Sequence, residues 1–311
     1  MTTPVLELGG LSVTFDGPHG HVYALRDASL SVGPGEVLVV AGESGSGKTV
    51  LAHALLRLLP RNARVTGSVR LDGRELLTLT ERELRRVRAA DVALVPQGAA
   101  TVLNPVRRLG AQAASTARYR RLPRHEVEDA LTDRMARFRL PWASTRRRYP
   151  HQLSGGMQQR TVTTLATIGR PRLIVADEPT NGLDADLVDA AADMLLDLRS
   201  DGAALVVVTH DLRLARRLGG RLALLYASTV VEVRDTAAVL DDPAHPYARG
   251  LVNALPEHGG TPIPGLPPRL DVLPPGCPFS ARCDSREPRC DESLPRLVPV
   301  RAGETRCVLH A

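Results

Sequence analysis

The chain has 311 residues, of which 43% are hydrophobic and 24% charged, and it carries a formal net charge of +6. This length allows one large α/β domain or two smaller ones with substantial cores. No apolar stretch approaches the roughly 20 residues of a membrane-spanning helix. Residues 1–10 lack the basic and apolar regions of a secretory signal, so we expect a cytoplasmic protein. Aromatic residues make up only 3% of the chain, so nucleic-acid stacking platforms are not expected, and we interpret the positive charge as spread over solvated faces.

The first 97 residues are predicted to form short strands around one helix. The helix is expected at Val50–Leu59 and ends at Pro60. Alternating or continuous apolar residues predict strands at Val5–Phe15, Tyr23–Val32, Glu36–Ala41, Ser68–Leu71 and Val92–Val95.

Three segments with different sequence patterns follow in the rest of the chain. From about Gly98 to Arg160 the pattern is helical and polar, which indicates an inserted helical subdomain. Apolar runs at Leu173–Ala176 and Ala204–Val208 then flank a helix at about Leu187–Ser200, an alternation typical of a mostly parallel sheet with crossover helices. Pro256–Pro275 is rich in Pro and Gly and predicts an irregular segment leading to a small tail unit.

The single lysine of the chain, Lys48, lies in a glycine-rich segment that fits G-x-x-x-x-G-K-[ST]. Between a strand and a helix, such a loop points backbone N–H groups at phosphates, and the helix dipole adds to the attraction. We therefore expect a nucleoside triphosphate, with Lys48 at its β- and γ-phosphates and Thr49 at Mg²⁺. The residues expected to hold the nucleotide are Gly42, Glu43, Ser44, Gly45, Ser46, Gly47, Lys48 and Thr49.

Two carboxylates, Asp177 and Glu178, follow the apolar run at Leu173–Ala176. Asp177 is placed to hold Mg²⁺ through water, and Glu178 to polarise an attacking water. Both are therefore candidate residues of the hydrolytic site.

Residues 153–160 read Leu-Ser-Gly-Gly-Met-Gln-Gln-Arg and match the signature of ATP-binding cassette (ABC) proteins, so the chain resembles that family. The resemblance implies that this segment contacts the γ-phosphate of ATP across a dimer interface, from a helix N-terminus. Two protomers would then enclose each ATP, and a monomer would bind ATP but hydrolyse it poorly. The contacting residues are expected to be Ser154, Gly155, Gly156 and Gln158.

The same resemblance gives roles to residues that occur in family order. Gln97 would sense Mg²⁺ and the attacking water, and His210 would contact the γ-phosphate. Asp184 would lie in the loop that communicates across the dimer. Phe15 matches the aromatic residue that stacks on adenine, with Tyr23 as the second choice.

The fold implied is an α/β P-loop ATPase core with a parallel sheet, an antiparallel β subdomain, an inserted helical subdomain and a small Cys-rich C-terminal extension. We divide the chain into a core with β subdomain and P-loop at 1–97, a helical subdomain with the signature at 98–160, the rest of the core at 161–242 and the extension at 243–311.

Over its whole length the chain resembles the ATPase subunits of dipeptide, oligopeptide and nickel importers, and looks most like the first of the two paired ATPases of a dipeptide importer. The matching segments are Leu103-Asn104-Pro105, His245-Pro246-Tyr247, residues 263–268 and Gly276-Cys277. The resemblance implies two transmembrane permeases, a second ATPase and an extracytoplasmic solute-binding protein. The chain would then lie at the cytoplasmic face of the membrane, with no nucleic acid as partner.

Three positions depart from the pattern of that group. Gly98-Ala99 replaces the usual Asp-Pro after Gln97, Ala185-Asp186 replaces Val-Thr after Asp184, and Ala227-Ser228 replaces Ala-Gly. None removes a catalytic group. The first lies where a permease should dock, so the sequence does not specify the transported solute.

All four cysteines lie close to the C-terminal end, with the spacing C-x5-C-x6-C-x16-C. Disulfides are disfavoured in the cytoplasm, whereas four thiolates suit an iron–sulfur cluster or structural zinc. The residues alone leave a cluster, zinc and unmetallated thiols open, and the family resemblance implies a [4Fe–4S] cluster. The expected ligands are Cys277, Cys283, Cys290 and Cys307.

Three other functions compete with import. A soluble cassette ATPase acting on nucleic acid or ribosomes usually carries two cassettes or a long coiled coil, and neither is present. An exporter half often has its permease fused to the cassette, and no spanning segment is found. A cassette that only regulates is disfavoured by the intact set of Lys48, Asp177, Glu178 and His210.

Overall fold

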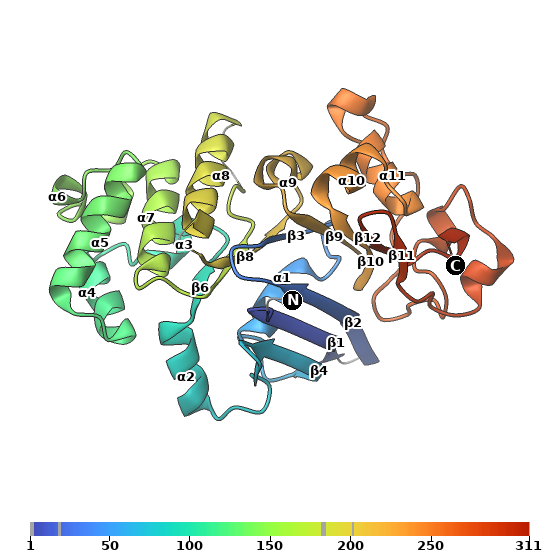
Figure 1. Cartoon of the computed structure of the whole chain (residues 1–311), viewed down its shortest axis with the longest axis horizontal. Helices are drawn as coiled ribbons and strands as arrows, with labels where there is room; N and C mark the ends of the chain where they lie inside the picture. The colour runs from blue at the N-terminus through green and yellow to red at the C-terminus, as the bar shows by residue number, and fades with distance from the viewer. Residues whose placement is uncertain (1–2, 18–19, 182–184, 201, 311) are drawn as a thin grey trace. The chain divides into compact units, whose positions relative to one another are not determined.

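A computed structural model describes residues 3–17, 20–181, 185–200 and 202–310, apart from the side chains of residues 99–100 and 185–187. The chain forms two compact units, each built from several segments of the sequence (Figure 1). Unit 1 comprises Met1–Leu6, Val32–Glu36 and Thr78–Val208, and unit 2 comprises Glu7–Ser31, Val37–Leu77 and Thr209–Ala311.

Unit 2 is built on a mixed sheet with the strand order β5-β4-β1-β2-β10-β9-β3, and β12 and β11 continue from β10. Strand β3 pairs with β9 in parallel, whereas β9 and β10 are antiparallel. The strands are β1 (Leu6–Gly17), β2 (Gly20–Val32), β3 (Val37–Ala41), β4 (Ala63–Leu71), β5 (Arg74–Glu75), β9 (Arg221–Tyr226), β10 (Thr229–Asp235), β11 (Val298–Val300) and β12 (Gly303–Thr305). Every residue of β3 is buried, as the apolar run predicted.

The helices of unit 2 are short. They are α1 (Lys48–Leu55), α9 (Leu212–Leu218), α10 (Thr236–Asp241), α11 (Pro246–Asn253) and the 3₁₀ turns η2 (Pro256–His258), η3 (Ser280–Arg282), η4 (Pro288–Asp291) and η5 (Val308–His310). The helix expected at Val50–Leu59 begins and ends earlier than predicted. Arg57 adopts a left-handed φ of 49°, and the N–H groups of Arg57 and Leu58 bond back to the carbonyls of Ala54 and His53. This is a Schellman motif with arginine where glycine is usual, and it stops the helix before Pro60.

Unit 1 combines a three-stranded parallel sheet with a group of helices. Strand β7 (Leu173–Asp177) lies between β6 (Val92–Val95) and β8 (Ala204–Thr209), with Leu173 opposite both Val92 and Ala204. This confirms the parallel core strands. The helices are α2 (Glu81–Ala90), α3 (Ala99–Val102), α4 (Leu109–Arg120), α5 (Arg124–Arg137), α6 (Trp142–Thr145), η1 (Pro150–Gln152), α7 (Gly155–Thr167) and α8 (Ala185–Ser200).

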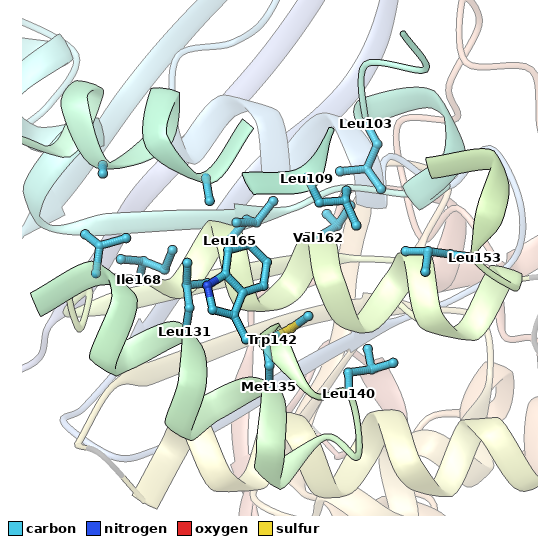
Figure 2. Packing of buried hydrophobic residues seen from close by; sticks show 13 residues of the cluster. Leu103, Leu109, Leu131, Met135, Leu140, Trp142, Leu153, Val162, Leu165 and Ile168 are labelled. Atoms are coloured by element: carbon cyan, nitrogen blue, oxygen red, sulfur yellow. The ribbon is translucent and has the colours of Figure 1, made fainter. Parts of the chain in front are cut away.

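One apolar cluster holds α4, α5, α6 and α7 together (Figure 2). Trp142 packs among Leu131, Met135 and Leu165, and its indole N–H donates to Glu128 at 2.9 Å, so the buried ring has a partner for its polar edge. The cluster consists of Leu103, Leu109, Ala113, Ala117, Val127, Leu131, Met135, Leu140, Trp142, Leu153, Val162, Leu165 and Ile168. It fixes α7, and therefore the orientation of the signature residues at the start of that helix.

No helix within the described part of the chain is both long and apolar enough to cross a bilayer.

Candidate functional site

The P-loop between β3 and α1 leaves no room for a side chain at two of its glycines. A Cβ atom on Gly42 would lie 2.0 Å from the carbonyl oxygen of Leu225, and one on Gly47 would lie 2.1 Å from that of Ala24. Gly47 also has a φ of +104°, in the region that favours glycine. Packing of the loop against β9 and β2 thus requires glycine at these two positions of the motif.

The loop places the single lysine over its own backbone. Lys48 is 7% exposed, and its Nζ donates to the carbonyls of Gly42 and Glu43, each at 2.9 Å. Thr49 is exposed in the first turn of α1. The side-chain oxygen of Ser46 is buried and makes no hydrogen bond. The motif predicts that the phosphates bind at this loop.

One departure from the importer pattern lies against this loop. Ala227 and Ser228 adopt left-handed φ values of 40° and 67°, which glycine would adopt more easily. The N–H of Ser228 donates to the carbonyl of Ser46 at 3.0 Å, and its hydroxyl donates to the carbonyl of Tyr23. Hydrogen bonding therefore holds Ser228 in the conformation that the replaced glycine would take.

The carboxylates after β7 occupy the carboxyl end of the parallel sheet of unit 1. Asp177 is 2% exposed and Glu178 is 9% exposed. Glu178 has a φ of +45°, and its N–H donates to the carbonyl of Val208 at 2.8 Å. A left-handed backbone at a non-glycine residue is strained and is common at functional sites, where surrounding contacts impose it.

Gln97 is exposed two residues after the end of β6, at the same edge of the parallel sheet of unit 1 as Asp177 and Glu178. A short distance along the chain, Leu103 enters the helical core. Asn104 caps the following turn by accepting the N–H of Val106 at 3.1 Å. The Leu-Asn-Pro segment thus anchors the chain after Gln97 to the helical subdomain.

The signature segment forms the start of α7. Ser154 is the N-cap, with its hydroxyl accepting the N–H of Met157 at 3.4 Å, and Ser154 and Gly155 are exposed. Open space surrounds the position of a Cβ on Gly155, whereas Gly156 is buried. Gln158 turns back and donates to the carbonyls of Pro150 and Leu153, so it braces the loop rather than extending from it.

His210 is exposed at the end of β8, and the next residue, Asp211, caps α9 by accepting the N–H of Arg213 at 2.8 Å. Asp184 lies outside the described residues. Of the two aromatic candidates for adenine, Phe15 is half-buried on β1 and Tyr23 is 40% exposed on β2.

The four cysteines border one small cavity in unit 2, together with His245. All four are free thiols, and Cys277, Cys290 and Cys307 are buried. Burial raises the pKa of Cys277 to about 11 and also raises the pKa values of Cys283 and Cys307. Among the described residues, which include all four cysteines, no three Cys, His, Asp or Glu side chains stand at metal-binding spacing.

His245 is the functional candidate beside the cysteines to which sequence reasoning gave no role. It is 1% exposed, and burial lowers the pKa of its imidazole to about 3, so the ring is neutral. Its Nδ1 accepts the N–H of Tyr247 at 3.0 Å, which places the ring proton on Nε2, where the structure shows no hydrogen bond. The His-Pro-Tyr motif was the signal for this residue, but not for its position beside the thiols.

Two family descriptions match the chain. The description "ABC transporter" covers residues 25–181, and "Oligopeptide/dipeptide transporter, C-terminal region" covers residues 231–290. The chain belongs to the ABC transporter family. As a member of it, this chain is an ATPase.

Similar proteins share nearly the full length of this ABC ATPase. The probable D,D-dipeptide transport ATP-binding protein DdpD of Escherichia coli is 38% identical over 99% of this chain and 96% of its own. The oligopeptide transport ATP-binding protein OppD of Escherichia coli is 37% identical over 97% of this chain and 92% of its own.

Solved cassettes confirm the fold. The dimeric structure of MJ0796, a bacterial ABC transporter cassette, matches 74% of this chain and 98% of its own, with 26% identity and a TM-score of 0.66. The same cassette in a post-hydrolysis state with ADP and Pi matches with a TM-score of 0.65 and 26% identity. This supports ATP hydrolysis as the reaction of the family member described here.

Proposed function

We propose that this ABC ATPase is the energy-coupling subunit of a membrane importer for dipeptides, oligopeptides or a related small solute. The observation that carries the proposal is the joining, in one chain, of the cassette core at 25–181 with the oligopeptide/dipeptide C-terminal region at 231–290. Relatives named for peptide transport share both parts over 97–99% of this chain.

The working form is a dimer in which each ATP lies between the P-loop of one protomer and the start of α7 of another. Support comes from the exposed Ser154 and Gly155, because the first N–H groups of a helix have no intrahelical acceptor and attract an anion. The dimeric cassette with a TM-score of 0.66 offers a precedent for such an assembly. ATP binding closes the dimer and hydrolysis reopens it.

Each residue of the site has a separate role in hydrolysis. Lys48 and Thr49 hold the phosphates and Mg²⁺, and Asp177 holds Mg²⁺ through water. Glu178 positions the attacking water, with its strained backbone fixing where the carboxylate can reach. Gln97 and His210 complete the surroundings of the γ-phosphate, and Asp184 relays closure across the dimer.

The partners are two transmembrane permeases, a second ABC ATPase and an extracytoplasmic solute-binding protein, which place this chain at the cytoplasmic face of the membrane. The test is an affinity pull-down of the tagged chain from native membranes in mild detergent, with mass spectrometry of what is retained. We expect two multi-span permeases and a second cassette.

The pull-down also tests the alternatives. Recovery of ribosomes or nucleic acid without a permease would overturn the import proposal and favour a soluble cassette. Recovery of a single permease-fused cassette would favour export. A Lys48→Ala variant serves as the control, because weaker nucleotide binding should not remove partners held by the folded chain.

We further propose that the four cysteines ligate a [4Fe–4S] cluster. Its support is the donor set alone, since no three of the described side chains stand at metal-binding spacing. Four thiols border one cavity, and the backbone N–H of Glu287 donates to the sulfur of Cys290 at 3.4 Å, the kind of contact that tunes cluster sulfurs. Because burial raises the pKa values of Cys277, Cys283 and Cys307, a metal must stabilise their thiolates as it binds. When bound, the cluster would supply a structural or redox-responsive cross-link.

Anaerobic purification tests this proposal. We expect a brown protein with absorbance at about 400 nm and roughly four iron and four sulfide per chain, because thiolate-to-iron charge transfer falls in that region. A colourless protein with one zinc per chain, or with no metal, would contradict the cluster and support one of the other two states.

A further inference from the structure

The C-terminal extension contacts the P-loop directly, and all the contacting residues belong to unit 2. The carboxylate of Glu43, the second residue of the loop, accepts from Nη1 of Arg282, with distances of 3.1 and 3.0 Å to its two oxygens. The backbone N–H of the same residue donates to the hydroxyl of Tyr247 at 2.9 Å. One P-loop residue is therefore held at both its side chain and its backbone.

Hydrogen bonds from all three nitrogens hold the guanidinium of Arg282 in place. Its Nε and Nη2 donate to the carbonyls of Pro264 and Ile263 at 2.8 and 3.2 Å, and Nη1 also donates to the hydroxyl of Tyr226 at 3.1 Å. It lies 5.6 Å from the centre of the Tyr226 ring, and its side chain is only 6% exposed. Such a planar fork is pre-organised, and lysine could not reproduce its geometry.

The contacts continue from Glu43 to the phosphate-binding lysine. The carbonyl of Glu43 accepts Nζ of Lys48 at 2.9 Å, so the orientation of the Glu43 backbone sets one of the contacts that place the ammonium. Arg282, Glu43 and Lys48 thus form an unbroken series of hydrogen bonds from the extension into the nucleotide site.

Arg282 and the residues near it are neighbours of two of the cysteines along the chain. Arg282 ends the η3 turn directly before Cys283, whose N–H donates to the carbonyl of Ser280. Phe279, two residues after Cys277, packs against Tyr247 with ring centres 5.5 Å apart. The backbone that carries the thiols therefore also carries the residues that hold Glu43.

We propose that Arg282 is a positioning residue for the P-loop, which sets the affinity of this ATPase for nucleotide through Glu43 and couples the four-cysteine region to the ATP site. Arg282 touches neither nucleotide nor metal in this role and acts through Glu43 and Lys48. The coupling to the cysteines rests on the metal site proposed above, whereas the positioning role does not.

The test uses the full chain and measures the Kd of a fluorescent ATP analogue. We expect Arg282→Ala to weaken binding about tenfold, within the usual range for coupling between contacting groups. Glu43→Gln should weaken nucleotide binding by a similar factor. The Kd of the double variant should be no higher than the higher of the two single-variant Kd values, because both changes break the same Arg282–Glu43 contact. Arg269→Ala is the matched control, since Arg269 is an 81% exposed arginine of the extension paired with Asp271.

Each outcome decides the proposal. A folded Arg282→Ala protein with wild-type circular dichroism and unchanged Kd, or additive effects in the double variant, would overturn the positioning role. If Arg282→Ala does not fold, Arg282→Lys keeps the positive charge but not the planar fork, and unchanged Kd there would overturn it. A wild-type chain that fails to bind ATP would instead count against the ATPase assignment itself.

The coupling to the cysteines has its own measurement. Cys283→Ser should weaken nucleotide binding in the wild-type background and change it much less in the Arg282→Ala background. An equal loss in both backgrounds would mean that the cysteines do not act through Arg282. An unchanged Kd for nucleotide in both backgrounds would contradict the coupling between the cysteines and the ATP site. The positioning role of Arg282 would then still be decided by the Arg282 and Glu43 variants.

Discussion

Gly47 shows how the P-loop restricts its own sequence at the scale of one residue. A methyl group there would lie 2.1 Å from the carbonyl oxygen of Ala24, at a φ of +104°. Gly45 has a φ of +77°, but open space surrounds the position of its Cβ. The two glycines therefore separate the cost of backbone strain from the cost of a clash.

We predict that Gly47→Ala weakens ATP binding at least tenfold and lowers the unfolding temperature. Gly45→Ala should have a smaller effect, because it bears only the strain of roughly 1–2 kcal/mol for a left-handed residue. Titration with a fluorescent nucleotide and thermal unfolding of both variants provide the comparison. Equal losses in the two proteins would show that packing against Ala24 does not restrict the loop.

The adenine contact is also decided by single residues. We predict that Phe15→Ala weakens ATP binding about tenfold, since stacking on a base contributes roughly 1–3 kcal/mol. Tyr23→Ala should leave it within about twofold, the exposed Tyr23 being the second choice. Inorganic tripolyphosphate, which has no base, should bind both variants like the wild type. A larger loss of ATP affinity in Tyr23→Ala than in Phe15→Ala would show that Tyr23, not Phe15, stacks on adenine.

At the scale of elements, the β4–β5 hairpin has a carboxylate that links its stability to pH. Burial raises the pKa of Glu75, but hydrogen bonds from Ser68 and from the N–H groups of Leu77 and Val69 outweigh burial and hold the pKa below its ordinary value of 4.5. A lowered carboxyl pKa stabilises the folded state above pH 4.5, and this contribution is lost as pH falls through the folded-state pKa.

We therefore predict that Glu75→Gln is less stable than wild type at pH 6 and that the difference narrows as the pH falls below about 4.5, towards the lowered pKa. Urea unfolding of both proteins across this range gives the two free energies. A difference that stays constant with pH would show that the ionised form of Glu75 gains nothing from its three donors.

Elements with a chemical signature could be predicted from the sequence, and elements set by local hydrogen bonding could not. The strand Val92–Val95 and the buried strand before the P-loop follow from apolar runs and match the structure. Sequence reasoning places the end of α1 too late because Pro60 is the only visible stop signal. The actual stop is Arg57 in a glycine-like conformation, which its residue type does not reveal.

At the scale of the whole molecule, the sequence shows where the motifs stand on the fold, because each has fixed spacing and lies at the end of a strand or the start of a helix. Their contacts with nucleotide stay a prediction. The contact between Glu43 and Arg282 joins residues 239 positions apart, and no pattern in the sequence indicates it. The division at 1–97, 98–160, 161–242 and 243–311 stays a prediction, as do the partners and the metal of the four-cysteine site.

The central claim is that ATP hydrolysis by this chain drives solute import. The most direct measurement is peptide uptake and ATP hydrolysis by the complex reconstituted in liposomes with its permeases, second ATPase and solute-binding protein. We predict that peptide and binding protein stimulate hydrolysis and uptake together. Glu178→Gln should retain ATP binding but reduce both by about two orders of magnitude, the contribution of a positioned base. Wild-type hydrolysis without peptide uptake, or full uptake by Glu178→Gln, would contradict this account.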